Sequence, residues 1–355
     1  MAQDVTIDDG KKRECIGVGR PTYFIAELSA NHNQDLDQAV RLIHAAKEAG
    51  ANAIKLQTYT PDTMTINCRT DAFRVKKGTI WENRYLYDLY QEAFTPWVWH
   101  ERLKSEAEGL GMHLFSTPFD TTAVDFLSDL DVAAFKIASF ELVDLPLIRH
   151  VASKGRPMIL STGMATLAEI EEAIQAARNG GCQELVLLKA NSGYPSPPEH
   201  MNLRSIPHLA QTFDVPAGLS DHTLGIAVPI AAVSLGACVI EKHLTLSREV
   251  PGPDSRFSLE PAEFKAMVAA VRIVEQALGS ISYGPCDFEG PSVALRRSLF
   301  VVRDVKAGER FDATNVRSIR PAGGLHPRYL DEVIGRTASK DIERGTPLSW
   351  KLVSR

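Results

Sequence analysis

Short apolar runs alternate with amphipathic stretches along most of the chain, and the runs are rich in β-branched residues. We predict eight strands from these runs, at residues 23–28, 53–59, 113–117, 134–139, 158–161, 185–190, 217–220 and 239–243. Between them, apolar residues recur with helical spacing, most clearly at 36–49, 97–110, 167–177 and 264–278. Strands and helices in alternation are typical of βα units that build a parallel sheet.

Several predicted helices have recognisable ends. Thr166 and Glu169 have the spacing of a capping box, in which each side chain binds a backbone N–H at the start of the helix. Gly50, Gly111 and Gly279 follow the last apolar position of three other helices, where glycine commonly ends a helix.

The number of units decides between two fold classes. Eight units match a (β/α)8 TIM barrel of about 250 residues, whereas an open doubly wound sheet normally has fewer strands. We therefore predict an α/β fold with a (β/α)8 TIM barrel at residues 1–280. Residues 281–296 contain many Gly, Pro and Ser residues and are predicted to form a linker. Short runs at 299–302 and 316–320 indicate a small second domain at 297–355, which needs docking for part of its stability.

One segment of the predicted barrel does not fit the alternation. Residues 61–94 are long for a connection and contain Trp81, Tyr85, Tyr87 and Tyr90. Two interpretations stay open: a partly helical lid, or an excursion that packs over the barrel.

Charge and composition exclude some classes of protein. The chain has 39 Lys and Arg against 44 Asp and Glu, a net charge of −5, so it has no broad basic field for nucleic acid. The longest apolar stretch, 226–240, is shorter than the roughly 20 residues of a membrane span. Because the first twenty residues lack an apolar secretory segment, we expect a cytoplasmic protein with no membrane partner. Five cysteines without a CxxC pair indicate reduced thiols.

Polar residues close many of the predicted strands. In a TIM barrel the reactive groups lie at the C-terminal ends of the strands. The residues at these positions are Glu27, Lys55, Gln57, Thr117, Lys136, Ser139, Ser161, Ser220, His222, Glu241 and His243. Together they predict a pocket for an anion beside a metal ion.

Two lysines interrupt otherwise apolar strands. Lys55 and Lys136 would be costly to bury without an anionic partner, and a phosphate or carboxylate ligand would satisfy both. The alternative is a structural pairing with Glu27 or Glu141 inside the barrel.

His222 and His243 end the seventh and eighth runs, so they lie on adjacent strands. Imidazole nitrogens suit Mn, Fe, Co or Zn, although histidine also packs, caps helices and acts as a general base. Asp254, on the loop after the eighth run, either approaches a substrate or is structural. Glycine-rich phosphate loops are absent from the sequence, so no nucleotide cofactor is expected.

The strand-end motifs resemble those of the phosphoenolpyruvate-dependent sialic acid synthases. The motifs that carry the resemblance occur in the family's order, at 26–33, 54–57, 135–141, 159–164, 218–223 and 240–243. The tail, with motifs at 296–298 and 319–321, resembles the family's antifreeze-like (SAF) domain. Ser192 departs from the family, because many members have Asn two residues before the matching tyrosine, Tyr194.

The resemblance implies a role for each matching residue. Phosphoenolpyruvate would be held by Lys55, Thr117, Lys136, Ser139, Ser161 and Ser220. The sugar would be held by Gln57, Glu141, Tyr194 and Asp254. His222 and His243 would bind a divalent metal ion, Mn²⁺ or Mg²⁺. Glu27 would transfer a proton or orient water, or it would only orient neighbouring groups.

The resemblance also implies an assembly and a reaction. Family members form domain-swapped homodimers, so the partner subunit's Arg320 would contact the sugar. The reaction joins phosphoenolpyruvate to an acetamido sugar and releases phosphate. The segments 27–32 and 252–259 look most like those of pseudaminic acid synthases, whose acceptor is 2,4-diacetamido-2,4,6-trideoxy-L-altrose. N-acetylneuraminate and legionaminic acid synthases are the alternatives within the family. A metal-dependent aldolase or lyase and a non-enzymatic carbohydrate-binding protein are the alternatives outside it.

Overall fold

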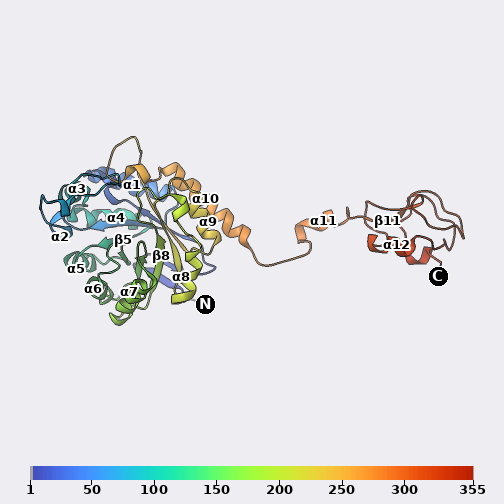
Figure 1. Cartoon of the computed structure of the whole chain (residues 1–355), viewed down its shortest axis with the longest axis horizontal. Helices are drawn as coiled ribbons and strands as arrows, with labels where there is room; N and C mark the ends of the chain where they lie inside the picture. Colours follow the sequence, from blue (N-terminus) through green and yellow to red (C-terminus); the bar gives the residue numbers. More distant parts are fainter. Residues whose placement is uncertain (1–2, 355) are drawn as a thin grey trace. The chain divides into compact units, whose positions relative to one another are not determined.

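The computed structural model describes residues 3–354, and the chain divides after Gly279 into two compact units (Figure 1). Unit 1 contains the predicted barrel, and unit 2 is the C-terminal part of the chain. Within the described residues, no helix has the length and hydrophobicity to cross a membrane.

Unit 1 is built on a closed barrel of eight parallel strands. The strands are β3 (Tyr23–Glu27), β4 (Ala53–Thr58), β5 (His113–Pro118), β6 (Phe135–Ile137), β7 (Met158–Ser161), β8 (Leu185–Ala190), β9 (Ala217–Asp221) and β10 (Val239–His243). They pair in sequence order, and β10 closes the barrel by pairing with β3. The predicted TIM barrel is confirmed, and each of the eight predicted runs contains a strand.

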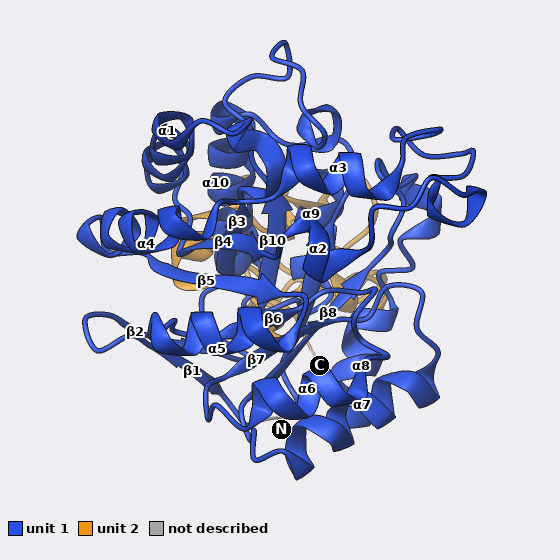
Figure 2. Cartoon of the chain, turned by 90° about the vertical axis from the view of Figure 1, so that its left-hand side faces the viewer, with its two compact units in different colours: residues 1–279 blue, residues 280–355 orange. Residues whose placement is uncertain are grey.

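Helices surround the strands (Figure 2). They are α1 (Leu36–Glu48), α4 (His100–Gly109), α5 (Thr121–Asp129), α6 (Leu145–Ala152), α7 (Leu167–Asn179), α8 (Ser205–Phe213), α9 (Ala227–Ser234) and α10 (Pro261–Leu278). The predicted capping box is present, because Thr166 accepts from the N–H of Glu169 and Glu169 accepts from the N–H of Thr166. The predicted helix at 97–110 is instead a 3₁₀ turn, η3 (Trp97–Trp99), followed by α4.

A hairpin that we did not predict precedes the barrel. Strands β1 (Val5–Asp8) and β2 (Arg13–Ile16) pair antiparallel, with Ile7 and Ile16 fully buried in the barrel core. The carbonyl of Lys12 lies 3.1 Å from Nε2 of His113 at the start of β5, and Thr6 N–H donates to Glu184, just before β8. The hairpin therefore covers the N-terminal ends of the strands.

A buried ion pair joins the last two strands. The side chains of Asp221 in β9 and Lys242 in β10 are in contact, and both are fully buried. Lys242 also donates to the carbonyl of Thr223 at 2.6 Å, and Asp221 accepts from Thr223 N–H and its hydroxyl. These contacts tie together the residues that directly precede His222 and His243.

Unit 2 has a hydrophobic core of its own, which includes Leu299, Phe311 and Leu348. Strands β11 (Ser298–Val301) and β12 (Val316–Ile319) pair antiparallel, in the two runs that the sequence indicates. The remaining elements are η6 (Asp287–Glu289), α11 (Gly290–Val293), η7 (Pro327–Tyr329), α12 (Leu330–Val333) and η8 (Trp350–Leu352).

Candidate active site

The polar strand ends meet inside the C-terminal mouth of the barrel. The register aligns Glu27 of β3 with Lys55 of β4 on one side and with His243 of β10 on the other. Gln57 lies opposite Thr117 of β5 in the same way. Since neighbours at the same level of a barrel share its inner face, these side chains converge on one space.

Lys55 lies in a cluster of buried charges. Its Nζ is 2.5 Å from Oε2 of Glu27 and 3.8 Å from Oε1 of Glu241, and it donates to the hydroxyl of Thr117 at 3.4 Å. Gln57 donates to Glu27 at 3.1 Å. The structural pairing that we left open for Lys55 is therefore present. These carboxylates raise its pKa against the effect of burial, which keeps Lys55 positively charged.

The two carboxyl groups beside Lys55 titrate differently. Burial raises the pKa of Glu27, and its contact with Lys55 does not fully offset this effect. Burial also acts on Glu241, but Lys136, Lys55 and the hydroxyl of Ser220 outweigh it and lower its pKa. Ser220 donates to Glu241 at 2.8 Å. Glu241 is therefore the carboxylate, and Glu27 is the group that retains a proton more readily.

Lys136 has different surroundings, although it is equally buried. Its Nζ donates to the hydroxyl of Ser161 at 2.7 Å and to the carbonyl of Ile137 at 2.9 Å. No carboxylate of residues 3–354 lies within ion-pair distance of it, so the pairing with Glu141 that we left open is not formed. Burial lowers the pKa of Lys136 to about 8. An anion at this position would favour the charged form and raise this pKa again.

Hydroxyl groups gather beside Lys136 around a glycine. Gly163 N–H donates to the hydroxyl of Ser139 at 3.1 Å. A methyl group at Gly163 would lie 2.6 Å from the hydroxyl oxygens of both Ser139 and Ser192. The Ser192 hydroxyl is buried and lacks a hydrogen-bond partner among the described residues. The site therefore holds a free hydroxyl at the position where the sequence departs from the family.

His222 and His243 lie together at the ends of β9 and β10, with ring centroids 5.4 Å apart. His222 Nδ1 donates to the carbonyl of Asn191 at 2.8 Å, and His243 Nδ1 lies 3.0 Å from the hydroxyl of Ser29. Burial lowers the pKa of both rings. A neutral His222 with its proton on Nδ1 has a lone pair on Nε2, which is the form that binds a metal ion.

In the part of the chain that the structure describes, the two histidines have no third protein ligand beside them. Among residues 3–354, no group of three or more His, Cys, Asp or Glu side chains is arranged to hold a metal ion. The donor set therefore fits a metal that takes two imidazoles and completes its coordination with water and substrate.

The predicted sugar residues lie around the same mouth. The ring of Tyr194 is 4.4 Å from that of His222. Asp254 is half-buried and accepts from Ala30 N–H at 3.4 Å, and desolvation of its carboxyl raises its pKa. Burial also raises the pKa of Glu141 to about 7, and its Oε2 is buried without a hydrogen-bond partner among residues 3–354. Arg320 belongs to unit 2, where it directly follows β12.

Two residues that we did not predict contact the site, together with Glu241, a strand-end residue to which we gave no specific role. Glu241 lies two positions before His243, and the two-residue period of a strand places both on the inner face. Phe257, in η5 (Ser255–Phe257), packs edge-on against His243 at 4.9 Å. Trp81 contacts Tyr194 across 113 positions of sequence, and no local pattern indicates that contact.

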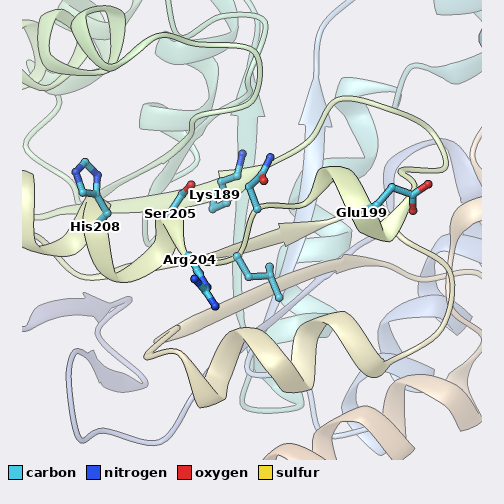
Figure 3. A pocket seen from close by; sticks show the side chains of 7 residues that line it. Lys189, Glu199, Arg204, Ser205 and His208 are labelled. Carbon is cyan, nitrogen blue, oxygen red and sulfur yellow. The ribbon is translucent and has the colours of Figure 1, made fainter.

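A separate hollow lies on the outer side of the barrel (Figure 3). Its volume is about 640 Å³, and its lining includes Lys189 of β8 with Arg204, Ser205 and His208 at the start of α8. It contains none of the predicted site residues, so the chemistry belongs to the barrel mouth.

Comparison with known proteins now identifies the family. Residues 42–283, more than half of the chain, match the NeuB family. The chain belongs to the NeuB family. Residues 296–354 of this NeuB-family protein match the SAF domain, as the tail motifs predict. The resemblance to the sialic acid synthases is thereby confirmed.

Relatives match over nearly the whole chain. Pseudaminic acid synthase of Campylobacter jejuni (strain 81-176) is 45% identical over 93% of this chain and 96% of its own. Pseudaminic acid synthase of Helicobacter pylori is 45% identical over 95% of this chain and 99% of its own. A solved N-acetylneuraminic acid synthetase of Leptospira borgpetersenii, in complex with citrate, is 32% identical with a TM-score of 0.72, covering 82% of this chain and 96% of that one.

Proposed function

We propose that the protein is a pseudaminic acid synthase that condenses phosphoenolpyruvate with 2,4-diacetamido-2,4,6-trideoxy-L-altrose. The observation that carries the proposal is the 45% identity to pseudaminic acid synthases over 93% of the chain. In the reaction, the methylene carbon C3 of phosphoenolpyruvate bonds to the aldehyde carbon of the open-chain sugar, and the aldehyde oxygen takes up a proton to become a hydroxyl. Water adds to the former enol C2, the C2–O bond to phosphate breaks, and pseudaminic acid and phosphate are the products.

Phosphoenolpyruvate lies on the side of the mouth formed by β4–β7 and β9. Lys136 supplies a buried cation that lacks a carboxylate within ion-pair distance in the described chain. The residues that would hold phosphoenolpyruvate are Lys55, Thr117, Lys136, Ser139, Ser161 and Ser220, and the free hydroxyl of Ser192 supports a further contact. Charge-assisted hydrogen bonds of this kind are stronger than neutral ones.

His222 and His243 would hold a divalent metal ion, Mn²⁺ or Mg²⁺, through their neutral rings. When bound there, such an ion supplies a Lewis acid that polarises the sugar aldehyde. Gln57, Glu141, Tyr194 and Asp254 would surround the sugar. Glu27 is the proton-transfer group of the proposal, since its raised pKa suits a side chain that both accepts and donates a proton.

Two observations disfavour the alternatives outside the family. A metal-dependent aldolase or lyase has no use for the hydroxyls around Lys136, and a carbohydrate-binding protein has no use for the buried charges beside Glu27. Within the family, synthases of N-acetylneuraminate and legionaminic acid use similar chemistry, so only the acceptor distinguishes them.

We further propose a domain-swapped homodimer in which the partner subunit's Arg320 reaches the sugar. Large apolar side chains are exposed on loops at the rim of the mouth: Phe140 after β6, Met164 after β7 and Leu224 after β9. In the first residues of unit 2, Tyr283 and Phe288 are each 95% exposed. A second copy of the chain would cover these surfaces.

The acceptor is tested by a substrate panel. With phosphoenolpyruvate and a divalent metal, we expect phosphate release with the trideoxy diacetamido altrose sugar and much less with N-acetylmannosamine or the legionaminic acid precursor. Release without any sugar is the control for simple hydrolysis. Equal or faster turnover of N-acetylmannosamine would contradict the assignment of the acceptor.

The metal site is tested by binding. Titration calorimetry with Mn²⁺ should show one site in the wild type, and His243→Ala should weaken it by at least about tenfold, because one of two imidazole ligands is removed. His208→Ala, a change of an exposed histidine on α8, is the matched control and should bind Mn²⁺ normally. Wild-type Mn²⁺ affinity in His243→Ala, or full activity after metal removal, would contradict the site.

Lys136 is tested by the pH dependence of phosphoenolpyruvate binding. Its pKa of about 8 means that it is charged below pH 8 and loses its proton as the pH rises. We expect the affinity to fall above pH 8, by up to about tenfold per pH unit. Lys136→Met should bind weakly at every pH, whereas Lys136→Arg should lack the alkaline loss because arginine stays charged. Equal phosphoenolpyruvate affinity of Lys136→Met and wild type would refute the assignment.

Shared sites are tested by mixing two inactive variants. Arg320→Ala and His243→Ala protomers should each be inactive alone. After subunit exchange, a mixed dimer has one site in which an intact barrel faces an intact Arg320, so part of the activity should return. No recovery after exchange has been verified would reject the swapped arrangement.

A further inference from the structure

The segment between β4 and α4 contains a loop whose conformation is held by contacts at the protein surface. Its elements are α2 (Pro61–Met64), η2 (Asp71–Phe73) and α3 (Leu86–Ala93). Between η2 and α3, Val75 N–H donates to Arg84 O at 2.8 Å and Asn83 N–H donates to Val75 O at 3.0 Å, so residues 76–82 form the tip of a hairpin-like loop. From residue 65 to residue 88, no side chain is buried. The loop therefore has no core of its own.

Polar and cation–π contacts hold the base of this loop. The guanidinium groups of Arg69 and Arg74 lie 4.9 and 5.0 Å from the ring centre of Tyr85. Arg74 also donates to the Tyr85 hydroxyl at 2.8 Å. These contacts fix the conformation of the base of the loop, but they do not involve the tip at residues 76–82.

Trp81 connects the tip to the active site. Its indole N–H donates to the carbonyl of Pro253 at 2.9 Å, directly before Asp254. Its ring centroid lies 5.3 Å from that of Tyr194 and 6.3 Å from that of Phe257. The rings of Tyr194 and Phe257 are themselves 5.2 Å apart, so the three form one aromatic cluster.

This aromatic cluster reaches the two histidines. Tyr194 lies 4.4 Å from His222, and Phe257 lies 4.9 Å from His243, measured between ring centroids. The cluster comes from the loops that follow β4, β8 and β10, whereas Lys136 and Ser161 come from β6 and β7. The cluster is therefore an aromatic wall beside the two histidines, and it is built from other loops than those that follow the strands of Lys136 and Ser161.

We infer that Trp81 is a substrate-recognition residue, whose ring forms with Tyr194 and Phe257 the wall that binds the apolar substituents of the acceptor sugar. The inference rests on the proposed function and deepens it. A sugar with acetamido methyl groups and a deoxygenated carbon has apolar patches, and aromatic rings bind such patches while a few polar groups set the orientation. Asp254 directly follows the residue to which Trp81 is anchored, so this polar group lies next to the aromatic wall.

The test compares variants of two tryptophans. Trp81→Ala removes the ring, and we expect the KM for the sugar to rise by at least about tenfold, as loss of a hydrophobic contact surface does in other binding pockets. The dissociation constant of phosphoenolpyruvate, measured without sugar, should stay unchanged. Trp81→Phe keeps an aromatic ring and should lose less. An unchanged sugar KM in Trp81→Ala overturns the inference.

Trp97→Phe is the matched control. Trp97 also donates its indole N–H to a backbone carbonyl, that of Tyr59 at 3.1 Å, but its ring stacks on Phe126 of α5. This variant should keep the wild-type KM for the sugar. A rise in KM equal to that of Trp81→Ala would show a general effect on the fold and would also overturn the inference.

A spectroscopic measurement separates recognition from mere anchoring of the loop. The chain has four tryptophans, so a variant with Phe at Trp97, Trp99 and Trp350 retains only Trp81. Its emission should shift when the sugar is added, and an unshifted spectrum overturns the inference. If wild-type protein turns over none of the sugars in the panel, the proposed function fails instead, and the two failures are thereby distinguished.

Discussion

Charge in the mouth of a closed barrel is the constraint on which the site depends. Four ionisable residues there are at least 96% buried: Lys55, Lys136, Glu27 and Glu241. Because water does not solvate them, partners in the protein or in a ligand must offset the cost of their desolvation. Lys55 and its two carboxylates satisfy one another, whereas Lys136 has only a hydroxyl and a carbonyl oxygen. This asymmetry leaves one cation able to attract an anion.

The barrel was predictable because its strands have a strong pattern. Parallel strands that are covered on both faces consist of short apolar runs, and eight such runs with helices between them leave few other folds. The hairpin of β1 and β2 was missed because its strands are only four residues each, although the turn residues Asp9 and Gly10 between alternating positions are a signal for it. The helix expected at 97–110 begins as a 3₁₀ turn at Trp97–Trp99, where the indole of Trp97 also binds the carbonyl of Tyr59, and local spacing reports neither feature.

The residues that meet at the site were predictable, but the contacts between them were not. The rule that strand ends converge places Lys55, Lys136, His222 and His243 together without any knowledge of distance. Which lysine has a carboxylate partner depends on the register of neighbouring strands, and the register aligns Glu27 with Lys55. The contacts of Trp81 with Pro253 and Tyr194 join distant parts of the chain, so neither periodicity nor spacing could indicate them.

The hairpin at the opposite end of the barrel has a consequence for how such proteins diverge. It covers the floor of the barrel with Ile7 and Ile16, so this end of the strands is packed by residues that are not part of the loops at the mouth. Mutations in those loops can then alter the preferred sugar while the scaffold tolerates them. This division of labour suits a lineage in which a pseudaminic acid synthase and an N-acetylneuraminic acid synthetase are both similar to one chain. A barrel that is packed at one end by a hairpin can therefore accept more sequence change in the loops at its other end.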